Sequence, residues 1–242
     1  MSTLKMTEHE VRLSATTRLV GWGLLAGGVC FFVGGAMHPK EDPPGVTRHE
    51  VLRLMFVDRA WYPAHFLILI GSVLIAAALI ALVRGPTLAV VPRAQRVGII
   101  AAVGAVLGAV GALVHLLAAL DAGRIAAHAA TPFVDLMGPV ETLTVPAFGF
   151  SIATLAVIGA LTRTLGNRVT AGLGVIGGVA YGIAGATIMF TDLLDFLFPA
   201  AGGIGLWTVA AGIGLLLGAR ARARDRSNAS PDARPTNPGA QR

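Results

Sequence analysis

Six long apolar segments, separated by short polar ones, dominate the pattern of the chain. Their bounds are 19–37, 61–83, 97–120, 140–162, 169–190 and 200–219. About 20 apolar residues in a helix, at about 1.5 Å per residue, cross the hydrocarbon core of a bilayer. The lengths favour helices over strands, because a lipid-exposed backbone must satisfy its own hydrogen bonds. The pattern therefore predicts an all-α, polytopic bundle of six transmembrane helices.

Polar sequence flanks the six apolar segments at both ends of the chain. Residues 1–17 form a short polar lead, residues 18–219 the transmembrane domain, and residues 220–242 a basic tail. The tail is rich in Ser, Asn, Pro and Arg, a composition typical of disordered segments. We therefore expect one structured domain with a lead and a disordered tail.

The composition is that of a membrane protein. The chain is 55% hydrophobic and 13% charged, and its mean hydropathy is +0.73. Soluble domains contain about 25% charged residues. The net charge of +6 is explained by transmembrane topology and by contact with anionic lipid, so the bilayer is the expected partner and nucleic acid is not. Arg far exceeds Lys and small apolar residues abound, which suggests a bacterial origin.

The basic residues predict the orientation of the spans. If the N-terminus is inside, only five of the 19 Lys and Arg residues fall on the extracytoplasmic side: Lys40, Arg48, Arg53, Arg59 and Arg124. Short loops rich in Lys and Arg stay in the cytoplasm. We therefore expect a multi-pass protein of the cell membrane with both termini in the cytoplasm.

A short amphipathic helix is predicted between the first two spans, on the extracytoplasmic side. Thr47 and Glu50 have the spacing of a capping box, and Val51, Leu54 and Met55 follow at helical spacing. Basic residues around them suit the plane of the lipid headgroups. An irregular ordered loop is the alternative.

The same topology gathers the titratable side chains on the extracytoplasmic side. Nine of the 13 acidic residues and five of the six histidines lie there, the histidines being His38, His49, His65, His115 and His128. Whatever chemistry the protein has is therefore expected to face outward.

His65 and His115 are the first candidates for a functional site. They lie about 6 Å and about 9 Å inside the predicted ends of their spans. Such residues inside a bilayer need partners. The bland alternative is a bond to a neighbouring carbonyl or hydroxyl, but two imidazoles at one level can also hold a metal ion or the iron of haem b. We therefore predict them as cofactor ligands. The full set of predicted metal ligands is His38, His65, His115, Asp121, Asp192 and Asp195.

Two further acidic features have structural explanations as well as functional ones. Pro139 and Glu141 are expected in the first turn of the fourth span, where a carboxylate suits the helix dipole. A functional role for Glu141 is an equal alternative. Asp192 and Asp195 would share one helical face if the fifth span continued through them, and could then hold a divalent cation or remain solvated.

Gly174, Gly178 and Gly182 repeat at intervals of four in the fifth span. Such small residues allow close contact between helices. The pattern predicts tight packing of the fifth span against another helix, and a homo-oligomer could form through this face.

Four functional classes fit this sequence. The best hypothesis is a membrane-embedded site for a transition metal or haem b. The alternatives are a structural or accessory subunit that docks another envelope protein, a metal-dependent membrane hydrolase with Asp121 as the base, and a carrier or channel. The last is disfavoured, because the cytoplasmic halves of the spans hold almost no titratable residue. Neither a substrate nor an enzymatic activity follows from the sequence.

Overall fold

Six long helices form the structure, a computed structural model that describes residues 8–39 and 45–228. They are α1 (Glu8–Met37), α3 (Trp61–Arg84), α5 (Pro92–Ala118), α7 (Pro132–Leu161), α8 (Arg168–Thr187) and α9 (Gly202–Asn228). Each contains a segment long and apolar enough to cross a membrane. No strand occurs in the described residues. The prediction of an all-α chain with six apolar spans is therefore confirmed.

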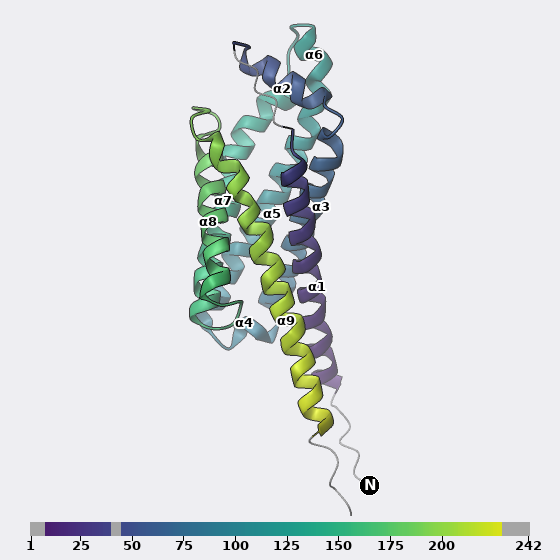
Figure 1. Ribbon diagram of the computed structural model, residues 1–242, viewed down its shortest axis with the longest axis vertical. Coiled ribbons are helices and arrows are strands. Elements are labelled where there is room, and N and C mark those ends of the chain that lie inside the picture. Colours follow the sequence, from purple (N-terminus) through teal and green to yellow (C-terminus); the bar gives the residue numbers. More distant parts are fainter. Residues whose placement is uncertain (1–7, 40–44, 229–242) are drawn as a thin grey trace, which may run out of the picture.

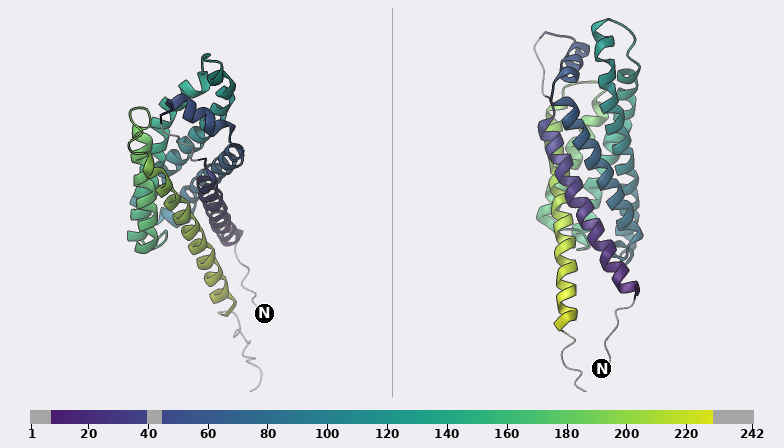
Figure 2. Two further views of the ribbon diagram at one scale, coloured as in Figure 1. Left: turned by 45° about the horizontal axis from the view of Figure 1, so that its top comes forward. Right: turned by 90° about the vertical axis from the view of Figure 1, so that its right-hand side faces the viewer.

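The long helices form a closed ring in chain order. Each packs against the next one along the chain, and α9 packs against α1 to close the ring (Figure 1). The start of α1 and the end of α9 lie at one end of the bundle, and both additional views in Figure 2 show them there. Because successive helices are antiparallel and their number is even, the first helix starts and the last helix ends at the same end of the bundle.

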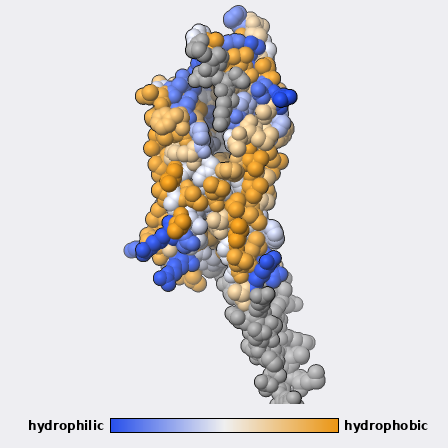
Figure 3. All heavy atoms as spheres, viewed as in Figure 1, coloured by the Kyte–Doolittle hydropathy of each residue, from blue (hydrophilic) through white to orange (hydrophobic). Residues whose placement is uncertain are grey.

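The surface of the bundle is divided into an apolar belt and two polar ends (Figure 3). Large apolar side chains in the belt point outward, as in Ile100 at 61% exposure and Leu143 at 73%. Water would oppose such an exposed surface, whereas lipid chains do not. The belt therefore identifies the lipid-facing surface of an integral membrane protein.

Short helices lie at both ends of the ring. At the end where the chain starts, α4 (Pro86–Ala89) joins α3 to α5. At the other end lie α2 (Arg48–Val57), η1 (Ala119–Asp121) and α6 (Ala122–Ala126), while η2 (Asp195–Ala201) precedes α9. We call the end with α2 and α6 the α2 end, and the opposite one the α4 end.

The short helix predicted after the first span is present as α2. The Glu50 N–H donates to Thr47 Oγ1 at 3.3 Å, which is one half of the predicted capping box. The other half is not formed, because the Glu50 carboxylate accepts two bonds from Arg53 at 2.8 and 2.6 Å. This hydrogen bonding by Arg53 lowers the pKa of Glu50 below its ordinary value.

Several predicted boundaries were wrong. The segment between the third and fourth predicted spans, 121–139, is largely helical: it contains the last residue of η1, all of α6 and the first turns of α7. α7 begins at Pro132, so Pro139 lies inside the helix and not in its first turn. α9 continues to Asn228 and so extends into the segment expected as the tail, whose predicted disorder stays a prediction. Ala and Arg alternate there, and both are good helix formers. The rest of the tail and part of the lead, 1–7, lie outside the described residues.

The glycine face of α8 packs against α7 of the same chain. A Cβ on Gly174 would lie 2.7 Å from the Cβ of Ala156, and one on Gly182 2.7 Å from the Phe150 ring. Gly178 lies against Gly149, where the two backbones nearly touch. The prediction of tight packing is confirmed. α7 already buries these glycines within the chain, and the homo-oligomer expected through this face stays a prediction.

Candidate metal centre

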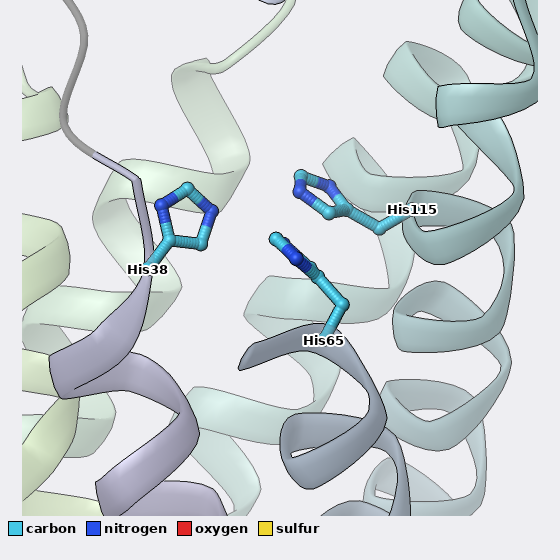
Figure 4. A group of neighbouring side chains, drawn as sticks. All are labelled: His38, His65 and His115. Atoms are coloured by element: carbon cyan, nitrogen blue, oxygen red, sulfur yellow. The ribbon is translucent and has the colours of Figure 1, made fainter. Parts of the chain in front are cut away.

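Three histidines from three helices converge at the α2 end. His38 follows the last turn of α1, His65 lies in the second turn of α3, and His115 lies near the end of α5. One ring nitrogen from each lies within 4.8 Å of those of the other two. Figure 4 shows the three rings around one common space. We call His38, His65 and His115 the histidine triad.

The rings of the triad are in close contact. The ring centroid of His65 lies 4.7 Å from those of both His38 and His115, and the centroids of His38 and His115 are 5.9 Å apart. A tetrahedral ion with Zn–N bonds of about 2.0–2.1 Å places its nitrogens about 3.3 Å apart. To reach this spacing around one ion, the stacked rings of His65 and His115 must turn so that their nitrogens face a common point.

The Nδ1 atom of each triad ring binds an oxygen. His65 Nδ1 donates to the Trp61 carbonyl at 2.7 Å, and His38 Nδ1 donates to the Pro39 carbonyl at 2.7 Å. His115 Nδ1 donates to Glu141 Oε1. A carbonyl oxygen can only accept, so the proton of His38 and His65 is on Nδ1. This tautomer leaves the lone pair on Nε2, the atom that a metal requires.

Two of the three Nε2 atoms are buried without a partner. The Nε2 atoms of His65 and His115 are inaccessible and make no hydrogen bond to any described residue. His65 as a whole is 2% exposed. Most buried polar side-chain atoms have a partner, and Trp61 Nε1 and Glu141 Oε2 at the same site also make no hydrogen bond to a described residue, so the place suits a bound ion or ordered water.

Trp61 forms one wall of the centre. Its ring stacks on His65 at 3.7 Å and on His115 at 5.1 Å, and it is 0% exposed. Phe56 of α2 packs edge-on against Trp61 at 4.6 Å. A small apolar cluster of α2, α6 and α7 residues continues around this pair. The α2 helix therefore covers the centre from outside.

Glu141 is the acid that the structure places at the centre. It is 4% exposed, and its Oε1 accepts from His115. The sequence pattern gave it two equal alternatives, a structural role in the first turn of the fourth span and a functional role. Because α7 begins at Pro132, Glu141 lies in the helix interior beside the end of α5. A carboxylate behind a histidine is a common second layer of metal sites, fixing the ring and raising its basicity.

Asp121 has a different position from the one predicted. Its Oδ2 accepts from the N–H groups of Phe133 and Val134 at 2.7 and 3.1 Å, and Arg124 lies 3.6 Å from Oδ1. It is 0% exposed. Free N–H groups at a helix start attract a carboxylate. Asp121 therefore holds the start of α7 and is not a member of the triad group.

Asp192 and Asp195 also lie outside the triad group. α8 ends at Thr187, so the two acids do not share a continuing helix as expected. Asp192 pairs with Arg48 of α2 at 2.9 Å, and the Asp195 N–H donates to the Asp192 carbonyl. His49 and His128 line a separate polar pocket between α2 and α6. Of the predicted ligands, the structure thus brings together only the three histidines.

The stacked rings do not suit haem b. Axial ligation needs two imidazoles on opposite faces of a porphyrin, each with a nitrogen directed at the iron. His65 and His115 are instead stacked face to face at 4.7 Å and 22° between planes. The stacking leaves no room for a macrocycle between them.

Comparisons of the chain with protein-family models, with curated proteins and with solved structures found no match. The function must therefore be inferred from the geometry of the candidate centre.

Proposed function

We propose that the protein is a membrane-embedded metal-binding protein, whose histidine triad holds one divalent transition-metal ion. The main observation is the pair of buried Nε2 atoms on His65 and His115, which make no hydrogen bond to a described residue. Metal ligation uses the lone pairs that these atoms offer. The oxygens bound to Nδ1 keep each ring in the ligating tautomer.

Ordinary packing explains the hydrogen bonds of the Nδ1 atoms but not the buried Nε2 atoms. A histidine in a membrane helix often bonds a nearby carbonyl, and His65 does so through Nδ1. That bond leaves the second nitrogen of the ring buried. A lone histidine could tolerate this, but His65 and His115 lie side by side and each adds a buried lone pair. One ion at the centre would satisfy both, with His38 as a third ligand.

The ligand set favours zinc or a similar ion. Imidazole suits Zn²⁺, Cu²⁺, Ni²⁺ and Fe²⁺, whereas thiolate and thioether ligands select Cu⁺. Cys30, the single cysteine of the chain, is not a member of the triad group. Three histidines leave one position of a tetrahedral ion open, as in zinc sites that bind a further ligand.

The hypothesis of a metal-dependent hydrolase with Asp121 as its base has less support. Asp121 Oδ2 accepts from two backbone N–H groups, and Oδ1 makes no hydrogen bond to a described residue but lies 3.6 Å from Arg124 Nε. The accessory-subunit alternative predicts no bound metal at all. Metal content therefore distinguishes it from the present proposal.

A titration of the purified protein in detergent tests the proposal. We expect one Co²⁺ per chain, with the visible absorption of a four-coordinate ion, and displacement of Co²⁺ by Zn²⁺. Because Trp61 stacks on two of the ligands, binding should also quench its fluorescence. The matched variant Trp61→Phe should bind Co²⁺ without this change. Absence of stoichiometric Co²⁺ and Zn²⁺ binding would contradict the proposal and favour the accessory role.

We further propose that the centre faces outward across the cell membrane. The connections at the α4 end contain Arg84, Arg93, Arg96, Arg163 and Arg168, and few acids. Such loops remain in the cytoplasm. A reporter fused after Arg242 should therefore be active only in its cytoplasmic form. Activity of a periplasmic reporter at that position would place the centre on the cytoplasmic side.

A further inference from the structure

We infer that a groove between α7 and α8, at the α4 end, binds one anionic phospholipid, with an acyl chain in the groove and the headgroup on Arg163 and Arg168. The two helices lie side by side (Figure 1), and large apolar side chains on their outer faces are exposed to lipid. The groove and the proposed metal centre lie at opposite ends of the bundle, so either can be occupied without the other.

Small residues form the floor of the groove, and larger apolar residues form its rims. Ala160 of α7 and Ala171 of α8 are buried, and a Cβ on Gly172 would meet nothing within 4 Å. Leu161 of α7 and Ile176 of α8 line the same groove and are exposed. Its volume is about 310 Å³, at the lower end of the range for small-molecule sites. The lipid-facing surface is therefore hollowed here, in a form that a flexible hydrocarbon chain can fill.

The length of the groove matches one leaflet of a bilayer. Its lining residues on α8 extend from Arg168 to Ile176, which is about 12 Å along the helix at about 1.5 Å per residue. The hydrocarbon core of a bilayer is about 30 Å thick, so one leaflet contributes about 15 Å. Arg168 is the first residue of α8 and lies at the α4 end of the groove. An acyl chain in the groove would therefore have its headgroup beside Arg168.

The charge at this end of the groove is positive and has no counter-ion in the described part of the chain. Arg163 and Arg168 are exposed, and neither makes an ion pair with a described residue. No Asp or Glu occurs between Glu141 and Asp192, and both of these acids lie at the α2 end. Basic sites between transmembrane helices attract the phosphates of anionic lipids. A zwitterionic lipid would bring a cation that the two arginines repel.

Native mass spectrometry of the purified protein in a neutral detergent tests this inference, because it resolves each bound lipid. The probes are dioleoyl phosphatidylglycerol, which is anionic, and dioleoyl phosphatidylcholine, which has the same chains and no net charge. One basic residue beside an anionic headgroup changes the affinity about fivefold. With two arginines, we expect the first phosphatidylglycerol to bind about tenfold more tightly, or better, than the first phosphatidylcholine.

Two variants separate the headgroup from the acyl chain. Arg168→Gln should lower the affinity for phosphatidylglycerol about fivefold and leave that for phosphatidylcholine unchanged. Gly172→Leu should lower the affinity for both lipids by about fivefold or more, because the leucine side chain fills the floor of the groove.

Arg84→Gln and Gly214→Leu are the matched controls. Arg84 is an exposed arginine at the end of α3, which is not next to α8 in the ring. Gly214 lies in α9, and a Cβ there would also meet nothing within 4 Å. Both controls should keep the two lipid affinities within about twofold of wild type, because they change charge or volume away from the groove.

Several outcomes would overturn the inference. Equal affinity of the wild type for the two lipids would remove the selectivity for an anion. An equal loss in Arg84→Gln and Arg168→Gln would mean that charge acts without a defined site. Unchanged lipid binding by Gly172→Leu would remove the groove as the place of the acyl chain. A dimer in the same spectra that Gly172→Leu dissociates would assign the groove to a second copy of the chain.

A second measurement applies if Gly172→Leu does not fold. Phosphatidylglycerol with a photoreactive acyl chain, added to the wild type at one equivalent, should label peptides within residues 157–176. Labelling confined to other helices would overturn the inference. Neither measurement requires bound metal, so a failure of the proposed metal site would leave both results unchanged.

Discussion

Replacing His65 or His115 with alanine should abolish metal binding at micromolar concentrations of Co²⁺ or Zn²⁺. In the proposed centre each ring supplies one of three ligands, and each has a buried Nε2 atom without a hydrogen-bond partner among the described residues. Loss of a second-layer partner alone typically costs about 10- to 100-fold in metal affinity. Loss of a ligand should exceed that range. His38→Ala should have an effect in the same direction. The measurement is Co²⁺ absorbance together with elemental analysis of the purified variants.

Two control variants define the specificity of this effect. His49 is an exposed histidine on α2, at the same end of the bundle, and Cys30 lies on α1. His49→Ala and Cys30→Ala should retain one Co²⁺ per chain with wild-type affinity. Equal retention of metal in all five variants would remove the triad as the ligand set. Thermal unfolding of each variant, followed by circular dichroism, separates loss of a ligand from loss of the fold.

Gly149→Ala should destabilise the bundle by about 3 kcal/mol, the upper end of the usual cost of overpacking. A Cβ on Gly149 would lie 2.5 Å from the Gly178 carbonyl oxygen and 2.7 Å from the Gly182 nitrogen. Both atoms belong to the α8 backbone, so they cannot move aside as a side chain could. The two helices must separate, and close packing is the main force between helices in lipid. Unfolding in detergent with increasing dodecyl sulfate measures the change.

Gly172→Ala is the matched control for this variant. Gly172 also lies in a transmembrane helix, α8, but a Cβ there would meet nothing within 4 Å. Alanine is a better helix former than glycine, so the stability of Gly172→Ala should equal or slightly exceed that of the wild type. Equal stability of Gly149→Ala and Gly172→Ala would mean that α7 and α8 pack less closely than these distances indicate.

The sequence by itself determined the number of spans and the helical class, because both follow from local properties. Length and apolar composition alone decide whether a segment can cross a bilayer, and a lipid-facing backbone has few alternatives to a helix. The comparable depths of His65 and His115 also follow from one-dimensional counting along each helix. Their proximity could therefore be expected from the spacing of residues along the chain.

Only the tertiary structure decided which acid accompanies the histidines. Asp121 and Glu141 lie at similar depths in the sequence pattern, near the same ends of neighbouring spans. Asp121 instead holds the N–H groups at the start of α7, and this capping makes the helix begin at Pro132 and places Glu141 against His115. Which acid lies beside His115 depends on how α5 and α7 pack against each other. Hydrophobic periodicity records which residues avoid water, but not the rotation of one helix against the next, and that rotation determines the side chains that share a site.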